Sequence, residues 1–266
     1  MKFWKYHGIG NDFVLVEDFA GERVSGAPEL ARDVCRRHFG IGADGLVLIT
    51  TAQGLYTMRI FNPDGSEAEM CGNAIRCVAH HLFAEGYAAG SSIQINTLSG
   101  VKEVRRAGGL YAVDMGEPQF EGKDLPAAGV QAVDAAGISW KVHPVSMGNP
   151  HGVVFVDDAA AVPIAAWGPA LEKHPVWPAH ANIEFVQVTG PAELQVRVWE
   201  RGAGPTLGCG TGACAAAVWA ARLGLAERTV KVKLPGGELE VRWENDNHVW
   251  MMGPAVRVFA GSCHRS

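Results

Sequence analysis

The sequence lacks a long apolar run and a strong charge imbalance. Its longest uninterrupted apolar run, 213–221, is about nine residues, well short of the roughly 20 that a transmembrane helix needs. The chain has 23 basic and 28 acidic residues, a net charge of −5, and no local cluster of Lys and Arg. Nucleic-acid-binding domains usually carry a basic patch. We therefore expect neither a membrane nor a nucleic acid as a partner.

The sequence also lacks a cysteine pattern. No two of its six cysteines are spaced as Cys-x-x-Cys, which argues against a zinc site or a disulfide scaffold. Residues 1–5 lead directly into patterned sequence without the apolar core of a signal peptide. We therefore expect a cytoplasmic protein without a metal, in which each cysteine is a thiol that is either inert packing or reactive.

An internal repeat is the most informative feature that is present. The 266 residues are 48% hydrophobic, enough for a sizeable core. Segments of the first half recur about 138 residues later, in the same order. The matched segments are 10–11 with 148–149, 58–62 with 196–200, 71–72 with 209–210, 100–105 with 237–242, and 115–116 with 252–253. The repeat predicts two equivalent halves, 1–118 and 119–254, and a C-terminal tail, 255–266, with 121–137 as the connection.

Each half is predicted to contain strands, one helix and further strands. The helices are expected at 73–85 and 211–223, each followed by a glycine. The strands are expected at 13–16, 46–49, 57–61, 101–104, 153–156, 184–188, 194–199 and 230–234. The second helix is apolar on every face and must be buried all round. We therefore predict an α+β fold of two pseudo-symmetric domains, each a curved, mostly antiparallel sheet wrapped around a central helix.

Two cysteines occupy equivalent places in the repeat. Cys71 and Cys209 each stand directly before a glycine and the start of a predicted helix. Unpaired N–H groups and the helix dipole at such a start favour a thiolate and bind carboxylates. A single buried cysteine is more often a small apolar side chain, but this recurrence favours reactivity. Two such thiols on opposite sides of one substrate carbon would suit inversion of a stereocentre. Cys77 and Cys214 lie inside the predicted helices and are assigned to the core.

Several motifs surround these cysteines. They are His-Gly-Ile-Gly-Asn-Asp-Phe at 7–13, Phe-Asn-Pro-Asp-Gly-Ser-Glu at 61–67, Met-Cys-Gly-Asn at 70–73, Ser-Met-Gly-Asn-Pro-His at 146–151, Glu-Arg-Gly-Ala-Gly at 200–204 and Cys-Gly-Thr-Gly at 209–212. In this order and over nearly the whole chain, they resemble the diaminopimelate epimerase family. The resemblance implies a pyridoxal-phosphate-independent homodimer that needs no cofactor. It implies conversion of LL-2,6-diaminopimelate to the meso isomer, for lysine and peptidoglycan synthesis in bacteria.

The resemblance also implies roles for individual residues. Cys71 and Cys209 become the two acid/base residues, and His151 and Glu200 tune them or bind the α-amino group. The helix starts that hold the reacting carboxylate are Gly72, Asn73, Gly210 and Thr211. The side chains expected to bind the polar ends of the substrate are Asn11, Asn62, Asn149, Asn182, Glu200 and Arg201, with Arg201 as a bidentate clamp on a carboxylate. The repeat pairs Asn11 with Asn149 and Asn62 with Glu200, which simple turn residues would not require.

Three positions depart from the family pattern. Pro205 stands where a Glu is usual, and it could alter the loop that lines the site. Ala74 replaces a common Gly, which should favour the helix slightly. Gly45 stands where some members have a Gln, so it is assigned no ligand contact.

Two other functions stay open. One is a related cofactor-independent racemase of another polar amino acid such as histidine; a proline type is disfavoured, because its site need not bind a second zwitterionic group. The other is a binding or isomerase-like domain that kept the fold without the chemistry, which the presence of both cysteines disfavours. Uptake of solvent deuterium at the α-carbon of candidate amino acids distinguishes these functions.

Overall fold

A computed structural model describes residues 1–21, 24–126 and 129–263 of the chain. These residues form two compact units. The first unit combines Met1–Val113 with the described part of Gly253–Ser266, and the second unit is Asp114–Met252. The second unit is thus continuous in sequence, whereas the first is closed by the end of the chain.

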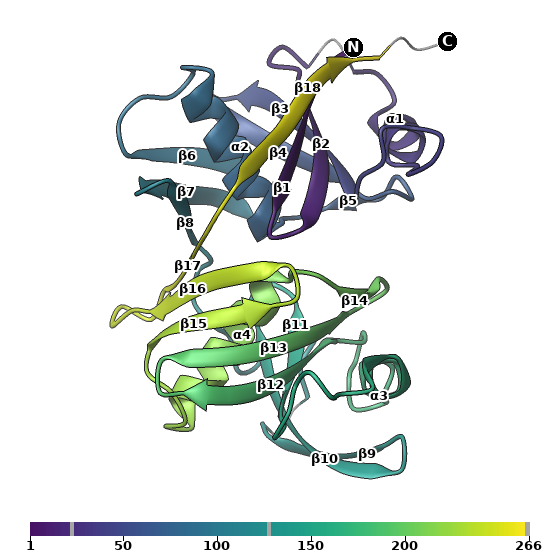
Figure 1. The fold of residues 1–266 in the computed structure, drawn as a ribbon, viewed down its shortest axis with the longest axis vertical. Helices are drawn as coiled ribbons and strands as arrows, with labels where there is room; N and C mark the ends of the chain where they lie inside the picture. Colours follow the sequence, from purple (N-terminus) through teal and green to yellow (C-terminus); the bar gives the residue numbers. More distant parts are fainter. Residues whose placement is uncertain (22–23, 127–128, 264–266) are drawn as a thin grey trace. The chain divides into compact units, whose positions relative to one another are not determined.

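The first unit contains two helices and a sheet (Figure 1). Its helices are α1 (Ala27–Val34) and α2 (Gly72–Ala84). Its strands are β1 (Lys2–Gly8), β2 (Asn11–Glu17), β3 (Gly45–Ala52), β4 (Leu55–Phe61), β5 (Glu67–Ala68), β6 (Ser92–Thr97), β7 (Gly100–Ala107), β8 (Leu110–Asp114) and β18 (Val256–Ser262).

The second unit has a matching set of elements. Its helices are α3 (Ile164–Glu172) and α4 (Gly210–Arg222). Its strands are β9 (Gln131–Ala135), β10 (Ile138–Ser146), β11 (Pro150–Phe155), β12 (Asn182–Gly190), β13 (Glu193–Glu200), β14 (Gly204–Thr206), β15 (Thr229–Leu234), β16 (Gly237–Trp243) and β17 (Val249–Gly253).

The internal repeat appears as one strand order used twice. The first unit runs β18-β1-β2-β3-β4-β6-β7-β8, with β5 beside β4. The second runs β9-β10-β11-β12-β13-β15-β16-β17, with β14 beside β13. The parallel pairs are equivalent: β2–β3 and β4–β6 in one unit, β11–β12 and β13–β15 in the other. The remaining pairs named in these orders are antiparallel, so the prediction of two mostly antiparallel repeats is confirmed.

The sheet of each unit wraps around one helix. Helix α2 contacts strands of its unit from β1 to β7, and α4 contacts strands from β10 to β16. Figure 1 shows each helix enclosed by its own strands. Ten of the thirteen residues of α4 are buried, and most of these are Ala or Gly, whose small size lets the strands approach closely. The predicted central helices are therefore confirmed, each one residue earlier in the chain than expected.

Each unit has one helix more than predicted, α1 in the first and α3 in the second, and two segments differ from the predicted domain organisation. The predicted connection, 121–137, contains β9, which pairs antiparallel with β10 and buries Val133; apart from 127–128, which lie outside the described residues, it is largely part of the second unit. The predicted tail, 255–266, contains β18, which pairs antiparallel with β1; 264–266 lie outside the described residues. Neither segment has a clear alternation of apolar and polar residues, because the outward-facing Ala132 of β9 is not polar and nearly all side chains of β18 are exposed.

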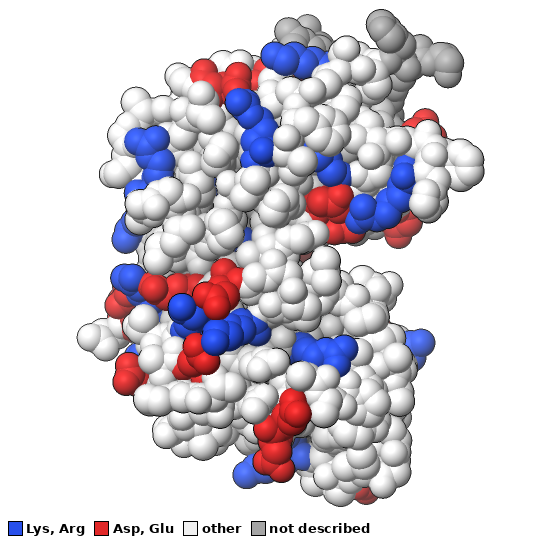
Figure 2. Space-filling view, viewed as in Figure 1, with Lys and Arg blue, Asp and Glu red and all other residues white. Residues whose placement is uncertain are grey.

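The surface carries mixed charge. On the face shown in Figure 2, Lys and Arg side chains lie among Asp and Glu, and neither sign forms a continuous field. Within the described parts of the chain, no helix combines the length and the apolar character required to cross a bilayer.

Candidate active site

Cys209 is the N-cap of helix α4. Its backbone is extended (φ −99°, ψ 112°), and its carbonyl accepts the first helical hydrogen bond from Ala213. Its Sγ accepts the N–H of Gly212 at 3.4 Å, and the hydroxyl oxygen of Thr211 lies 3.5 Å from the sulfur. Polar side chains at N-caps satisfy helix N–H groups in this way. The helix start therefore fixes the position of this sulfur.

Acidic groups surround the Cys209 thiol. Burial raises its pKa well above the usual range, and the negative charges of Glu200 and Glu184 raise it further, against hydrogen bonds from Thr211 and Gly212. Glu200 ends β13 and accepts a 2.5 Å hydrogen bond from the Thr206 hydroxyl. Burial of the Glu200 carboxyl raises its pKa, and the bond from Thr206 opposes this. Cys209 is therefore a neutral thiol at rest, suited to donate a proton.

His151 lies behind these acids on β11. Its side chain is fully buried; its Nδ1 is 2.7 Å from Oε1 of Glu184, and its Nε2 is 2.9 Å from Oδ1 of Asn149. Asn149 lies in the turn between β10 and β11, where Gly148 has a positive φ of 93°. His151 also lies close enough to Glu200 to lower the pKa of its carboxyl. The structure therefore brings Cys209, Thr211, Glu200, His151 and Asn149 together in one cluster.

Asn182 and Arg201 form a separate arrangement in the second unit. The Asn182 side chain accepts the backbone N–H of Arg201 at 2.8 Å and donates to the carbonyl of Pro150 at 3.3 Å. The guanidinium of Arg201 is exposed and donates to the carbonyl of Ala179. Asn182 thus ties the turn after β13 to β11, and Arg201 is the more accessible of the two predicted binding residues.

In the first unit, Cys71 is the N-cap of helix α2. Its backbone is again extended (φ −142°, ψ 119°), and its carbonyl accepts the N–H of Ile75. Its thiol donates to Oδ1 of Asn11, 3.7 Å away, and the same oxygen accepts from the Asn73 amide at 3.2 Å. Cys71 is partly exposed, unlike Cys209. The two cysteines therefore occupy equivalent positions in their units but have different surroundings. Side-chain amides lie next to Cys71, and carboxyl groups lie near Cys209.

Hydrogen bonds continue from Asn11 and Asn73 to further side chains of the first unit. Asn11 donates to Asp44 at 2.9 Å, and Asn73 accepts from Arg76 at 2.7 Å. The side chain of Arg76 is fully buried and also donates to the carbonyl of Gly72 at 3.0 Å. Arg76 therefore fixes the first turn of α2. Asn62 is exposed and donates to the Ser66 hydroxyl within its own turn.

Sequence reasoning missed several residues of these clusters. Glu184, Asp44, Arg76 and Thr206 were assigned no role. Glu184 is an acid among the buried residues of β12, and Arg76 is a cation on a helix that the sheet encloses. Both are signals that the sequence contained. Pro205, one of the departures, lies in β14 opposite Trp199 and beside Thr206, so it occupies the strand that supplies the hydrogen bond to Glu200.

Comparisons with known proteins place the chain in a family. A model of the family described as diaminopimelate epimerase matches residues 3–121 and 144–258. Proteins named diaminopimelate epimerase from Moorella thermoacetica and Synechococcus elongatus are 49% and 48% identical over 274 and 273 residues, with 98% of each chain covered.

Solved structures agree on the fold. A phenazine biosynthesis protein of the PhzF family from Bacillus anthracis superposes with a TM-score of 0.76 at 17% identity, covering 98% of both chains. A hydroxyproline epimerase from Agrobacterium vitis gives 0.72 at 13% identity, covering 98% of this chain and 91% of that one. From its sequence relatives and the matching family model, the chain belongs to the diaminopimelate epimerase family, isomerases of the racemase and epimerase class.

Proposed function

We propose that this protein interconverts LL-2,6-diaminopimelate and meso-2,6-diaminopimelate without a cofactor, by proton transfer between the α-carbon and the thiols of Cys71 and Cys209. The observation that carries this proposal is the pair of cysteines at equivalent helix N-caps, one in each unit. The named relatives favour diaminopimelate as the substrate, and they do not favour histidine.

The reaction needs one base and one acid at the same carbon. In one direction, a thiolate removes the α-proton from one face and becomes a thiol, and the electron pair delocalises into the carboxylate as an enolate. The second thiol then donates its proton to the opposite face and becomes a thiolate. Because burial and two acids hold the proton on Cys209, we assign Cys209 as the donor and Cys71 as the base in the direction that starts from this resting state.

The helix starts supply the charge stabilisation. The N–H groups of Gly72 and Asn73, and of Gly210 and Thr211, belong to the first turn of their helices, where N–H groups point out of the helix end. Such N–H groups, aimed at a carboxylate that gains charge, stabilise an enolate-like transition state. Asn11 and Asn149, together with Asn62, Asn182 and Arg201, are proposed to bind the distal amino-acid group. Glu200 is proposed to bind the α-amino group, and His151 to tune the acidic cluster around Cys209.

A homodimer is proposed as the assembled form. Strand β18 pairs with β1 and leaves apolar side chains exposed, namely Val256, Val258 and Phe259. Clusters of exposed apolar side chains commonly mark interaction surfaces. Sedimentation of the protein tests this: we expect a dimer that Val258→Glu dissociates, and a monomeric wild-type protein would contradict it.

The deciding experiment is α-proton exchange. The purified protein, without added cofactor, is incubated in deuterium oxide with LL-diaminopimelate, and in parallel with histidine, lysine or proline. We expect deuterium uptake and formation of the meso isomer with diaminopimelate alone. Uptake with histidine but not with diaminopimelate would assign the protein to the alternative racemase, and no uptake with any of them would refute the proposed chemistry.

A further inference from the structure

A second buried acid lies behind the proposed catalytic groups. The side chains of Glu184 on β12 and His151 on β11 are both 0% exposed and form a 2.7 Å contact between Oε1 and Nδ1. The other carboxyl oxygen of Glu184, Oε2, is also buried and has no hydrogen-bond partner among the described residues. In the proposed proton transfer, Glu184 acts only through its charge near the Cys209 thiol, and its contact with His151 has no role.

The first unit shows that the fold does not require this pair. The strand registers of the two units place Val47 at the position of Glu184, and Phe13 at the position of His151. Both of these apolar side chains are buried. Replacing a buried ion pair with well-packed apolar groups is often neutral or stabilising. The second unit therefore keeps the polar pair for a reason other than stability.

The charge of Glu184 needs a cation in contact with it. A buried carboxylate is costly unless an opposite charge pairs with it. Two titratable groups besides His151 belong to this cluster, the Glu200 carboxyl from β13 and the Cys209 thiol from α4, and neither can become positive. Since His151 is in hydrogen-bond contact with Glu184 and also interacts with Glu200, it is the group placed to carry the balancing charge.

A charged His151 determines how Asn149 is oriented. An imidazolium donates from both ring nitrogens. If Nδ1–H donates to Glu184, then Nε2–H donates to the Asn149 Oδ1, which lies 2.9 Å away. With its carbonyl oxygen occupied, the Asn149 side chain turns its NH2 group away from His151, as a hydrogen-bond donor.

We propose that Glu184 is a positioning residue: it holds His151 as the imidazolium, and His151 in turn fixes the Asn149 amide so that its NH2 group faces the substrate. The inference rests on the proposed function, in which Asn149 binds the distal end of diaminopimelate. An NH2 group donates to a carboxylate, whereas an amide oxygen repels it. Glu184 therefore makes this end of the site selective for a substrate carboxylate, through two intermediate side chains.

Glu184→Gln tests the protonation state directly. Glutamine has the same size, and its amide oxygen can still accept from Nδ1, so the variant should keep the fold. Without the carboxylate, His151 should be neutral near pH 7.5, its Nε2 should become an acceptor, and the Asn149 amide should turn round. The ring ¹⁵N chemical shifts, assigned to His151 by their loss in His151→Asn, report this: two protonated nitrogens in the wild type and one in Glu184→Gln. A neutral His151 in the wild type would overturn the proposal.

Kinetics on LL-diaminopimelate provide the second readout. Hydrogen bonds to charged groups contribute enough that kcat/KM should fall about 10- to 100-fold in Glu184→Gln. Most of the change should appear in KM, because the lost interaction binds the substrate throughout the reaction. An unchanged kcat/KM would overturn the role of Glu184.

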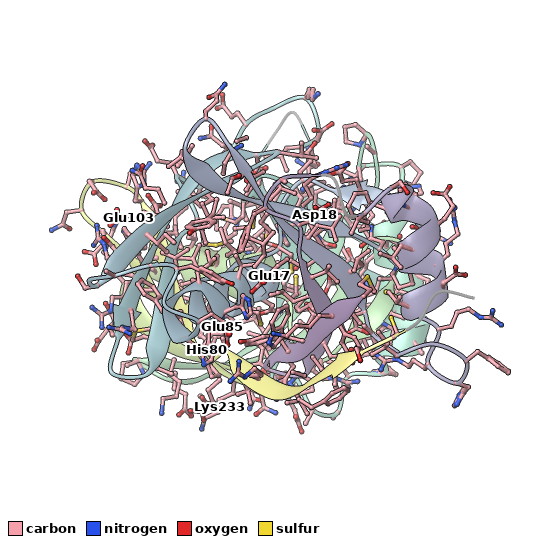
Figure 3. The ribbon with its side chains drawn as sticks, turned by 90° about the horizontal axis from the view of Figure 1, so that it is seen from above. Glu17, Asp18, His80, Glu85, Glu103 and Lys233 are labelled. Carbon is pink, nitrogen blue, oxygen red and sulfur yellow. The ribbon has the colours of Figure 1, made fainter. Side chains whose placement is uncertain are left out.

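The chain offers a matched control. Glu17 and His81 form a similar pair in the first unit, 2.8 Å apart with His81 fully buried, and Figure 3 shows Glu17 toward the interior of that unit. Glu17→Gln should leave kcat/KM within about twofold, and an equal loss in both variants would show a general structural effect and overturn the proposal. A wild-type protein that exchanges no α-proton would refute the proposed function, while the state of His151 would still be decided by its ¹⁵N shifts.

Discussion

The N–H of Gly212 donates to the sulfur of Cys209 over 3.4 Å, across the first turn of helix α4. The sulfur therefore serves as both the cap of the helix and the proposed acid. It cannot rotate without releasing a backbone N–H group at a buried helix end, where an unpaired donor is costly. The direction of this thiol is consequently determined by the helix that carries it.

Gly212→Ala should disturb the site more than the helix. A Cβ at this position would lie 2.8 Å from Oε1 of Glu184 and 3.3 Å from Sγ of Cys209. Overpacking of this kind costs about 1–3 kcal/mol, and displacement of the sulfur should lower kcat by a factor on the order of 100. Urea unfolding and steady-state kinetics measure both effects. The matched control is Ala74→Gly at the equivalent position in α2, which should cost about 0.5–1 kcal/mol of stability and spare kcat; similar kcat losses in both would contradict the argument.

Cys71→Ala and Cys209→Ala should each stop inversion of the stereocentre. A two-base reaction needs both groups, and a positioned acid or base contributes roughly 10²–10⁴-fold to a rate. Each variant retains one thiol, so it should exchange the α-hydrogen of one diastereomer only, without inverting it, and the favoured diastereomer should differ between the variants. Chiral chromatography combined with deuterium mass spectrometry measures both. Inversion at close to the wild-type rate in either variant would refute the two-thiol scheme.

Mild oxidation should join Cys71 and Cys209 in a disulfide and abolish activity. The reason is that both sulfurs must reach one carbon atom during the reaction. Cys77 should not compete, because its side chain is fully buried inside helix α2. Peptide mass spectrometry identifies the linked pair, and dithiothreitol should restore activity. Oxidised protein that retains both free thiols and full activity would show that the two sulfurs do not meet.

Glu200→Gln should stabilise the protein at neutral pH while inactivating it. Burial raises the pKa of Glu200 in the folded chain above its unfolded value, so the folded chain binds this proton more tightly. Stability from this group is then present below the unfolded pKa and is lost as pH rises through the folded pKa. The variant has no such titration, so its urea midpoint should exceed that of the wild type at pH 7–8 and approach it at acidic pH. A difference in urea midpoint between the variant and the wild type that grows toward low pH would contradict a raised pKa of Glu200.

The sequence predicted the elements whose signal is local or repeated. The helices predicted at 73–85 and 211–223 lie one residue from α2 and α4, and each predicted strand overlaps an observed one with ends that differ by up to three residues. Apolar periodicity and flanking glycines mark these elements. Helix α3 was missed because Gly168 and Pro169 inside it are typical of turns. Gly168 is required there by packing, since a Cβ would come within 2.5 Å of the Trp199 ring. Such a requirement depends on a residue 31 positions away and leaves no local signal.

The candidate site was predictable only in part for the same reason. The repeat identified Cys71 and Cys209 from sequence, and the structure places both at helix N-caps. The relay through Glu184 arises from the parallel pairing of β11 with β12, which brings together residues 33 positions apart. Strand pairing across a helical crossover has no signature within a short window. The partners of a catalytic group are therefore harder to find from sequence than the group itself.

The return of β18 to the first unit has a consequence for synthesis on the ribosome. All segments of the second unit have been made once residue 252 is added, but the first unit still lacks the strand that covers β1. Domains fold as units while the chain is being made. The part of the molecule that is translated first should therefore complete its folding last, with the edge of β1 open until translation ends.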